Sequence, residues 1–514
     1  MTTTAMEAQP VHPAGQRRRR LRLPQDPVRR VVLAVFVVAL ANGLLWSLLT
    51  PPFEVPDETA HIAYAQHLAE TGRRAGETGH PEYSDEQAAV MNAMAVQSIV
   101  GHPLQRTPPA GGPDRSADAA IQQATRTASR SNGGGPSTAS SQPPLYYALA
   151  AIPYRMFSWA SLPVRLEAMR VLSAVLFALS AALAAWLVAE LLPGRSWAAL
   201  VGGLAVGLSP YAAFVGSGVT PDVLLLLIGT ATLLIAVRAI RHGLTTRRAV
   251  ALGLAVGAGA MTKLTFLPFV PVALLVFVVL LWRDRAALRA ERRGMPGVIA
   301  AGVAAGVVLP ALFVLWVGLI GMPIMQAGTS TPSLSPDQIH VSNTREFASY
   351  TWQLYLPRLW FMTELFGGRI TPDIAWVQGF AGRLGWLDYD VAPRVIDVFR
   401  RVIEIGIVLI VAAAIQWRHA LWRNRLALAA LAAFSLALML VISKAGYDFR
   451  RTTGTAFEQP RYLLPIAGVW ALGVAFACLG LGRRLAPVLA IVVVGLLCLH
   501  DLAGILATLA RYYA

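Results

Sequence analysis

The sequence predicts an all-α integral membrane protein with about eleven transmembrane helices and two large extracytoplasmic loops. Hydrophobic residues make up 55% of the 514 residues and charged residues only 14%, whereas soluble globular domains carry about 25% charged residues. Apolar segments long enough to cross a bilayer also recur along the chain. The predicted spans are residues 31–50, 168–192, 197–216, 221–240, 249–263, 265–282, 297–320, 402–417, 426–443, 462–480 and 485–509.

The basic residues predict how these spans are oriented, because Lys and Arg are enriched in short cytoplasmic segments. With the N-terminus inside, the short segments on that side carry 22 of the 44 Lys and Arg residues. The first span follows four arginines at 17–20 and is long enough to remain as an uncleaved signal anchor. We therefore expect a multi-pass protein of the plasma membrane with a cytoplasmic N-terminus.

This orientation divides the chain into four parts. They are a basic tail (1–30), an N-terminal transmembrane core (31–320) that includes an outer loop (51–167), a second outer loop (321–401) and the C-terminal helices (402–514). The middle of the first loop is rich in Pro, Gly and Ser, so we expect it to lack a packed core.

The composition also excludes several classes of protein. Only two of the 44 basic residues are lysines, and the arginine excess alone is poor evidence for phosphate or nucleic-acid recognition. Cys478 and Cys498 both lie in apolar runs, which excludes a disulfide framework for the exported loops. No P-loop, Rossmann glycine pattern, HExxH or Cys cluster is present, so nucleotide hydrolysis and zinc protease chemistry have no support.

An acidic helix start directly follows the first span, in PPFEVPDETAH at 51–61. Asp57 and Glu58 fall in its opening turn, where the helix dipole favours anions, and His61 and Tyr64 continue the same face. The two acids either only stabilise the helix start or provide a carboxylate base at the membrane surface, where a lipid-borne substrate would arrive.

Two further charges lie at the outer ends of predicted spans. Asp222 opens a span just after Thr220, and helix capping alone can explain it. Lys263 lies only about 22 Å of helix beyond Arg248, which is less than the roughly 30 Å of bilayer hydrocarbon. An ionisable residue at that depth is a functional candidate.

Arginines at the outer ends of other spans have several readings. Arg170 either snorkels towards the membrane surface or anchors the first loop. Arg461, beside Tyr462 at the mouth of a span, is suited to bind a phosphate through its guanidinium group. Arg450 and Arg451 are more simply explained as charges at a span end.

The order of these features resembles the GT-C superfamily of membrane glycosyltransferases. The likeness rests on PDETAH at 56–61, QPPLYY at 142–147, AMRVLSAVLF at 168–177 and GVTPDVLL at 218–225. Within the superfamily the chain most resembles a bacterial family of membrane proteins of unknown function, through PPFEVPDETAH, TPDVLL, GAMTKLT, FAGRLGWLD and QPRYLLP. Gln142 stands where some relatives have His.

The resemblance implies a GT-C-like fold and the transfer of a sugar, with inversion, from a polyprenyl-phosphate-linked donor to an extracytoplasmic acceptor in the cell envelope. The acceptor would be a glycan, a glycolipid or a protein. A carboxylate base is implied, with Asp57 as first choice and Glu58 as second. The expected substrate-binding residues are His61, Tyr64, Arg170, Asp222, Lys263, Arg461 and Tyr462.

We expect Asp57, Glu58, Asp222, Lys263 and Arg461 to converge on one outward-facing cavity. No metal ligand and no cofactor are predicted, and a divalent cation stays open. Two other classes also stay open: a transporter or flippase of lipid-linked glycans, and a non-catalytic membrane partner in envelope assembly.

Overall fold

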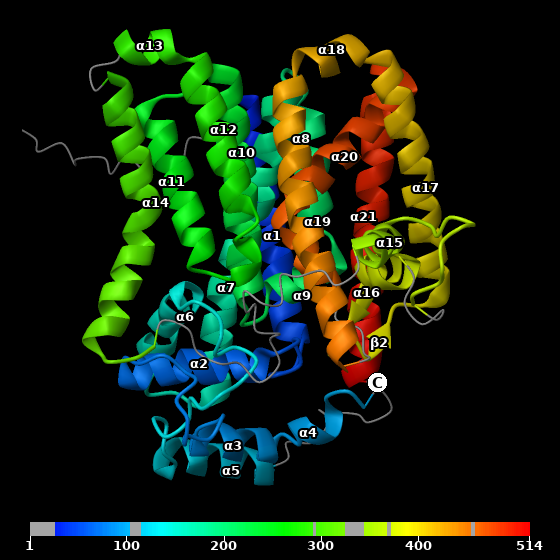
Figure 1. Ribbon diagram of the computed structural model, residues 1–514. Coiled ribbons are helices and arrows are strands. Elements are labelled where there is room, and N and C mark those ends of the chain that lie inside the picture. The colour runs from blue at the N-terminus through cyan, green and yellow to red at the C-terminus, as the bar shows by residue number, and fades with distance from the viewer. Residues whose placement is uncertain are drawn as a thin grey trace, which may run out of the picture.

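The computed structural model in Figure 1 describes residues 26–102, 115–290, 294–323, 344–366, 372–453 and 458–513. Within these ranges the regular structure is helical except for one antiparallel hairpin, in which β1 (Arg383–Leu384) pairs with β2 (Tyr389–Asp390). The predicted all-α class is therefore confirmed.

Long helices form a bundle that occupies most of the molecule (Figure 1). They are α1 (Pro27–Leu49), α7 (Leu162–Leu191), α8 (Ser196–Gly207) with α9 (Pro210–Gly216), α10 (Pro221–His242), α11 (Thr246–Ala260), α12 (Phe269–Arg283), α14 (Gly294–Leu319), α17 (Pro393–Gln416), α19 (Arg425–Thr453), α20 (Ala467–Cys478) and α21 (Gly482–Tyr512). Each of the eleven predicted segments is helical. Among the described residues, seven helical stretches are long and apolar enough to cross a membrane, or eight if the bent pair α8–α9 is one span. One of these seven stretches is Pro460–Tyr512, and the number eleven stays a prediction.

The start of α10 follows the predicted capping pattern. The hydroxyl of Thr220 accepts a hydrogen bond from the backbone N–H of Asp222 at 3.3 Å, and Pro221 occupies the first helical position. Both features stabilise a helix start, because the first N–H groups of a helix have no partner within the helix. As a result, Asp222 is held at one end of a helix that is buried on most sides.

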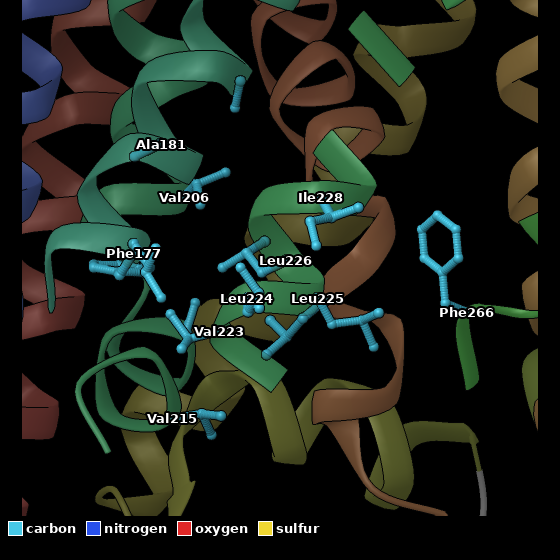
Figure 2. Packing of buried hydrophobic residues seen from close by; sticks show 14 of the residues in the cluster. Phe177, Ala181, Val206, Val215, Val223, Leu224, Leu225, Leu226, Ile228 and Phe266 are labelled. Atoms are coloured by element: carbon cyan, nitrogen blue, oxygen red, sulfur yellow. The ribbon is translucent and has the colours of Figure 1, made fainter. Parts of the chain in front are cut away.

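The core of the bundle lies around α10. Figure 2 shows Val223 and Leu226 of α10 among Phe177 of α7 and Val206 of α8, all of them buried. At α11 and α14 the backbones come even closer, since a Cβ added at Gly253 would lie 2.2 Å from the carbonyl oxygen of Gly302. Small residues permit such close helix packing in membranes.

Opposite ends of the bundle carry different connections (Figure 1). The short basic helices α13 (Arg285–Ala290) and α18 (Arg418–Arg423) lie at one end. The other end, which we call the first-loop end, carries α2 (Glu58–Thr71), α3 (Asp85–Ala93), α4 (Val96–Ile99), α5 (Arg115–Thr127) and α6 (Leu145–Met156). This separation matches the charge pattern, while the assignment of the first-loop end to the outside stays a prediction.

The expectation that the middle of the first loop lacks a packed core is wrong for residues 115–141. Helix α5 packs on α3, and Ser140 is fully buried. Gly134 has φ +85°, and a Cβ there would lie 2.3 Å from the ring of His67. Glycine and serine occur here because the backbone approaches its neighbours too closely for larger side chains. Residues 103–114 lie outside the described part of the chain.

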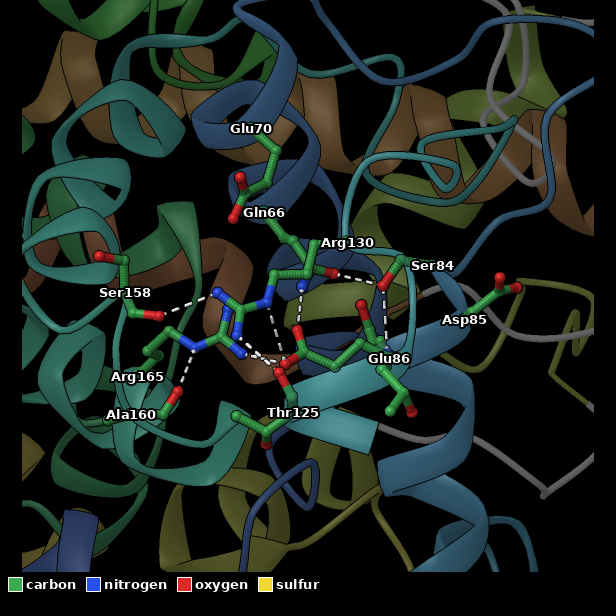
Figure 3. Close-up of polar contacts among 12 residues, drawn as sticks. Gln66, Glu70, Ser84, Asp85, Glu86, Thr125, Arg130, Ser158, Ala160 and Arg165 are labelled. Atoms are coloured by element: carbon green, nitrogen blue, oxygen red, sulfur yellow. Dashed lines mark hydrogen bonds and ion pairs between the residues drawn. The ribbon is translucent and has the colours of Figure 1, made fainter. Parts of the chain in front are cut away.

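A buried polar cluster fastens α3 and α5 to the bundle (Figure 3). Glu86 of α3 pairs with Arg165 of α7 and, at 3.3 Å, with Arg130. Gln66 of α2 donates to Glu86 at 2.9 Å and to the hydroxyl of Tyr154 in α6 at 3.1 Å. One carboxylate therefore joins α2, α3 and α7.

The second loop packs on helices of the bundle: α15 (Thr344–Tyr355) on α19, η3 (Asp373–Gln378) on α17, α16 (Gly379–Gly382) on α9, and the hairpin on α9 and α21. The indole of Trp386 donates to the carbonyl of Phe53 at 3.1 Å. A Cβ at Gly379 would lie 2.2 Å from the Pro460 ring. The second loop thus touches both chain segments that carry predicted site residues.

Candidate active site

Glu58 and Arg170 form a buried ion pair beneath the turn between α1 and α2. Nε of Arg170 donates to Oε1 of Glu58 at 2.9 Å, and Nη2 donates to Oε2 at 2.6 Å. The other Arg170 donors bind the carbonyls of Ser47, Thr50 and Pro51. A guanidinium has five N–H donors, and all five have acceptors here. All five donors are thus used within the protein and anchor the turn, and the predicted role of Arg170 in substrate binding stays a prediction.

The carboxylate of Glu58 is equally occupied. It also accepts hydrogen bonds from the backbone N–H groups of Phe53 and Val219, both at 2.9 Å, and its side chain has no exposed surface. A base must reach its substrate, so this enclosure favours Asp57, and Glu58 as second candidate for the base stays a prediction. Glu58 holds the turn before α2 against the residues that precede α10.

Asp57 precedes α2 in a left-handed conformation, with φ +62° and no side-chain capping bond. Non-glycine residues occupy this region at a cost in energy and often do so at functional sites. Its carboxylate accepts a hydrogen bond from Nη2 of Arg461 at 2.5 Å, and Nη1 of Arg461 lies 3.3 Å from the carbonyl of Pro56. The side chain of Asp57 is 25% exposed, compared with 6% for Arg461.

Asp222 and Lys263 extend this pair into a group of four alternating charges. Nζ of Lys263 donates to Oδ1 of Asp222 at 2.6 Å, and Nη1 of Arg461 lies 3.8 Å from Oδ2. Asp57, Arg461, Asp222 and Lys263 therefore form a chain of charges, which we call the charge quartet. Lys263 precedes η1 (Leu264–Phe266), and Arg461 lies in η4 (Pro460–Ile466). The predicted cavity around these residues stays a prediction.

The electrostatic environment keeps Asp57 ionised. Burial alone would raise the pKa of its carboxyl, but the charge of Arg461 and its hydrogen bond outweigh burial and hold the pKa below its usual value. His61 behaves differently, because burial lowers the pKa of its imidazole to about 3. At neutral pH the site therefore holds an aspartate beside an uncharged histidine.

Aromatic side chains cover one side of the charge quartet. Nδ1 of His61 lies 2.9 Å from the hydroxyl of Tyr147, and the rings of Tyr64 and Tyr147 are stacked with centroids 3.8 Å apart. On another side, Lys263 and Arg461 both lie over the ring of Tyr462, at 5.8 and 5.6 Å from its centroid.

Several residues near the site were not predicted individually. Tyr147 belongs to the QPPLYY segment and contacts His61, and Tyr211 accepts the backbone N–H of Arg461 at 3.2 Å. Arg74 donates to the hydroxyl of Tyr64 at 3.3 Å. The QPPLYY motif was the one signal in the sequence that pointed to this part of the site.

Arg450 and Arg451 contact a different group of residues at the end of α19. The guanidinium of Arg450 lies over the ring of Phe366 and that of Arg451 over Tyr447. Within the described ranges, no three His, Cys, Asp or Glu side chains are grouped so that they could hold a metal ion.

The fold and the site define a multi-pass, all-helical membrane protein with a charge quartet at one end of its bundle. The chain belongs to the family described as "Predicted membrane protein (DUF2142)", whose model matches residues 40–470. The match includes all the predicted site residues. A search of curated protein sequences finds no match.

Solved structures resemble the fold at low sequence identity. ArnT from Cupriavidus metallidurans in the apo state is 14% identical, with 87% of this chain and 59% of that chain covered and a TM-score of 0.43. The archaeal oligosaccharyltransferase AglB from Archaeoglobus fulgidus, in complex with an inhibitory peptide and a dolichol-phosphate, is 14% identical, with 94% and 56% covered and a TM-score of 0.46. ArnT bound to undecaprenyl phosphate gives 14% identity, coverage of 93% and 76%, and a TM-score of 0.45. The chain spans a little over half the length of the first two proteins.

Proposed function

We propose that the protein is a GT-C-type glycosyltransferase that moves a sugar from a polyprenyl-phosphate-linked donor to a hydroxyl group of an envelope acceptor. The observation that carries the proposal is the charge quartet, in which Asp57 is the most exposed member. A strained, partly exposed acid beside two cations suits a reaction that needs a base and a phosphate site. The ordered motifs of the sequence point to the same reaction.

The donor phosphate would bind to Arg461 and Lys263. Both cations are paired with carboxylates in the described structure, so the phosphate has to compete for them. Nε of Arg461 is buried and has no hydrogen-bond partner among the described residues, which leaves one donor for a phosphate oxygen. We infer that the phosphate takes the place of the Asp57 carboxylate on Arg461.

This exchange would prepare Asp57 to act as the base. Its pKa is held low by Arg461, and a phosphate that neutralises the guanidinium charge would let the pKa rise towards its usual range. A carboxylate with a higher pKa accepts a proton more readily. Donor binding and base activation are thereby coupled through one guanidinium group.

The transfer itself is a single displacement. Asp57 takes the proton of the acceptor hydroxyl, whose oxygen forms a bond to the anomeric carbon of the sugar. The bond from that carbon to the phosphate oxygen breaks, and its electron pair leaves with the polyprenyl phosphate. Attack opposite the leaving group inverts the anomeric centre, and Arg461 with Lys263 stabilises the charge on the departing phosphate.

The direct test is transfer by the purified protein in nanodiscs. Radiolabelled decaprenyl-phosphate sugars would be supplied with envelope fractions as acceptors, and label in the acceptor would be counted. Asp57→Asn should abolish the transfer seen with the wild type, whereas Asp118→Asn, which changes an exposed acid on α5, should not. Movement of intact donor across sealed vesicles without transfer would instead indicate a flippase.

A further inference from the structure

Three connections meet around Trp417 at the end of the bundle opposite the first loop. Trp417 lies between α17 and α18. Arg195, from the connection between α7 and α8, lies over its ring at 4.9 Å from the centroid. Arg483, from the first turn of α21, lies over the same ring at 4.8 Å. Two guanidinium groups from distant parts of the sequence are therefore held around one indole.

The indole is fixed by its neighbours. It packs on a small buried cluster of Ala413, Leu479 and Ala486. The adjacent side chain, Gln416, donates to the carbonyl of Gly480 at 2.8 Å, and this ties α17 to the segment before α21. The packing around Trp417 therefore fixes the backbone positions from which the two arginine side chains extend.

Within the described ranges, the two arginines have no acidic counter-ion. Residues 192–197, 416–426 and 479–488 contain six arginines and no Asp or Glu. Among the described residues, neither Arg195 nor Arg483 forms a salt bridge, although Glu190 at the same end of the bundle pairs with Arg238, Arg241 and His242. Burial, together with the charge of Arg483, lowers the pKa of Arg195. The cluster therefore has a positive charge that an anion would relieve.

Exposed apolar residues flank this cluster in the sequence. Ile415, Leu481, Leu485 and Val488 are all exposed, at 65%, 47%, 54% and 57%. A pair of arginines and exposed apolar side chains together supply the two features that a phospholipid-binding site needs. These are a cationic site for the headgroup and an apolar surface for an acyl chain. A free phosphate ion would use only the first.

We propose that Arg195, Trp417 and Arg483 bind the headgroup phosphate of an anionic phospholipid. In the predicted orientation this lipid belongs to the cytoplasmic leaflet. The planar guanidinium group of arginine can donate two parallel hydrogen bonds to phosphate oxygens. Trp is enriched at the membrane interface, and basic pockets between helices bind anionic headgroups. The acyl chains lie along the exposed face of Leu485 and Val488.

The test is lipid retention measured by native mass spectrometry. Full-length protein would be released from nanodiscs that contain equal amounts of phosphatidylglycerol and phosphatidylcholine. The wild type should retain phosphatidylglycerol preferentially, and Arg195→Gln combined with Arg483→Gln should lower that retention roughly tenfold, because two charge-assisted contacts are lost. The matched control is Arg423→Gln with Arg425→Gln, which removes the same charge at the same end and should retain the lipid.

Equal loss of lipid in the two double variants would show a general effect of charge and overturn the site. Protection from thermal unfolding by millimolar inorganic phosphate, equal to that by phosphatidylglycerol, would assign the site to free phosphate and overturn the lipid proposal. Since Arg483 is exposed, the single variant Arg483→Gln should fold even if the double variant does not. A folded Arg483→Gln protein with wild-type retention would also contradict the proposal.

Discussion

Nη2 of Arg461 lies 2.5 Å from Oδ2 of Asp57, although 404 positions separate the two residues in the sequence. The contact joins a segment near the last helices to the first turn after α1. Asp57 is thereby neutralised by a residue whose other neighbours, Asp222 and Tyr462, belong to the same site. The state of this one ion pair should govern both the charge and the basicity of Asp57.

Asp57→Asn should lower kcat by about 10²–10⁴, the usual effect of removing a general base, and leave thermal stability close to that of the wild type. Asp118→Asn is the control. The wild-type pH profile of kcat/KM should stay flat on its acid side until below the normal range of an aspartate, because Arg461 holds the pKa of Asp57 low in the free enzyme. An acid limb near pH 6 would contradict this assignment.

Lys263→Met should raise the KM for the lipid donor by about tenfold and change kcat less, since it removes a charge that the bound donor already contacts. Steady-state transfer at varied donor concentration would measure both constants. Lys444, the only other lysine, pairs with Asp448 on α19, and Lys444→Met should leave both constants unchanged. A fall in kcat with unchanged KM would mean that Lys263 acts only in the transition state.

Arg170→Met should destabilise the protein by about 3–5 kcal/mol, because it leaves the carboxylate of Glu58 buried without a partner. The loss would appear as a lower midpoint in a thermal-shift assay of detergent-solubilised protein. Arg401→Met, which breaks an exposed ion pair with Glu404, should change the midpoint little. If Arg170→Met were fully stable and raised the donor KM instead, Arg170 would be a substrate-binding residue after all.

Gly134→Ala should impair folding far more than Gly101→Ala. Both glycines have positive φ, +85° and +71°, so both substitutions incur a backbone cost of about 1–2 kcal/mol. At Gly101 nothing lies within 4 Å of an added Cβ, whereas at Gly134 the ring of His67 lies 2.3 Å away. Fluorescence-detected size-exclusion chromatography would measure the yield of folded protein, and equal yields would show that the loop adapts.

Stability should decline as pH rises from about 4.5 to 8, in part because of Glu54. Burial raises the pKa of its carboxyl from 4.5 to about 8, so between these values the folded protein binds a proton that the unfolded chain has lost. Glu54→Gln should flatten this part of the curve of thermal midpoint against pH. An unchanged slope in the variant would assign the dependence to other groups.

Much of the helical frame follows from local sequence. Every predicted span is helical, and the cap at Thr220 and the helix end at Gly72 are formed by local residue types acting within one or two turns. Such features can be read from a short window of sequence because the interactions that create them are short-range.

The roles within the site depend on longer-range packing. Asp57 and Glu58 are adjacent acids that local pattern cannot tell apart. The tertiary structure turns Glu58 towards Arg170 and Asp57 towards Arg461. The glycines near residue 134 have the composition of a flexible linker, but they are packed. Composition alone does not show that their backbone lies against other segments of the chain.

The positions of the ion pairs along the chain suggest an order for their formation during biosynthesis. Membrane proteins are made from the N-terminus, and early segments fold before late ones exist. Glu58 can meet Arg170 once α7 has been synthesised, and Asp222 can then meet Lys263. Asp57 has to await Arg461, which the ribosome adds after most of the helices. The nascent protein thus completes its buried support first and acquires a neutral site only near the end of translation.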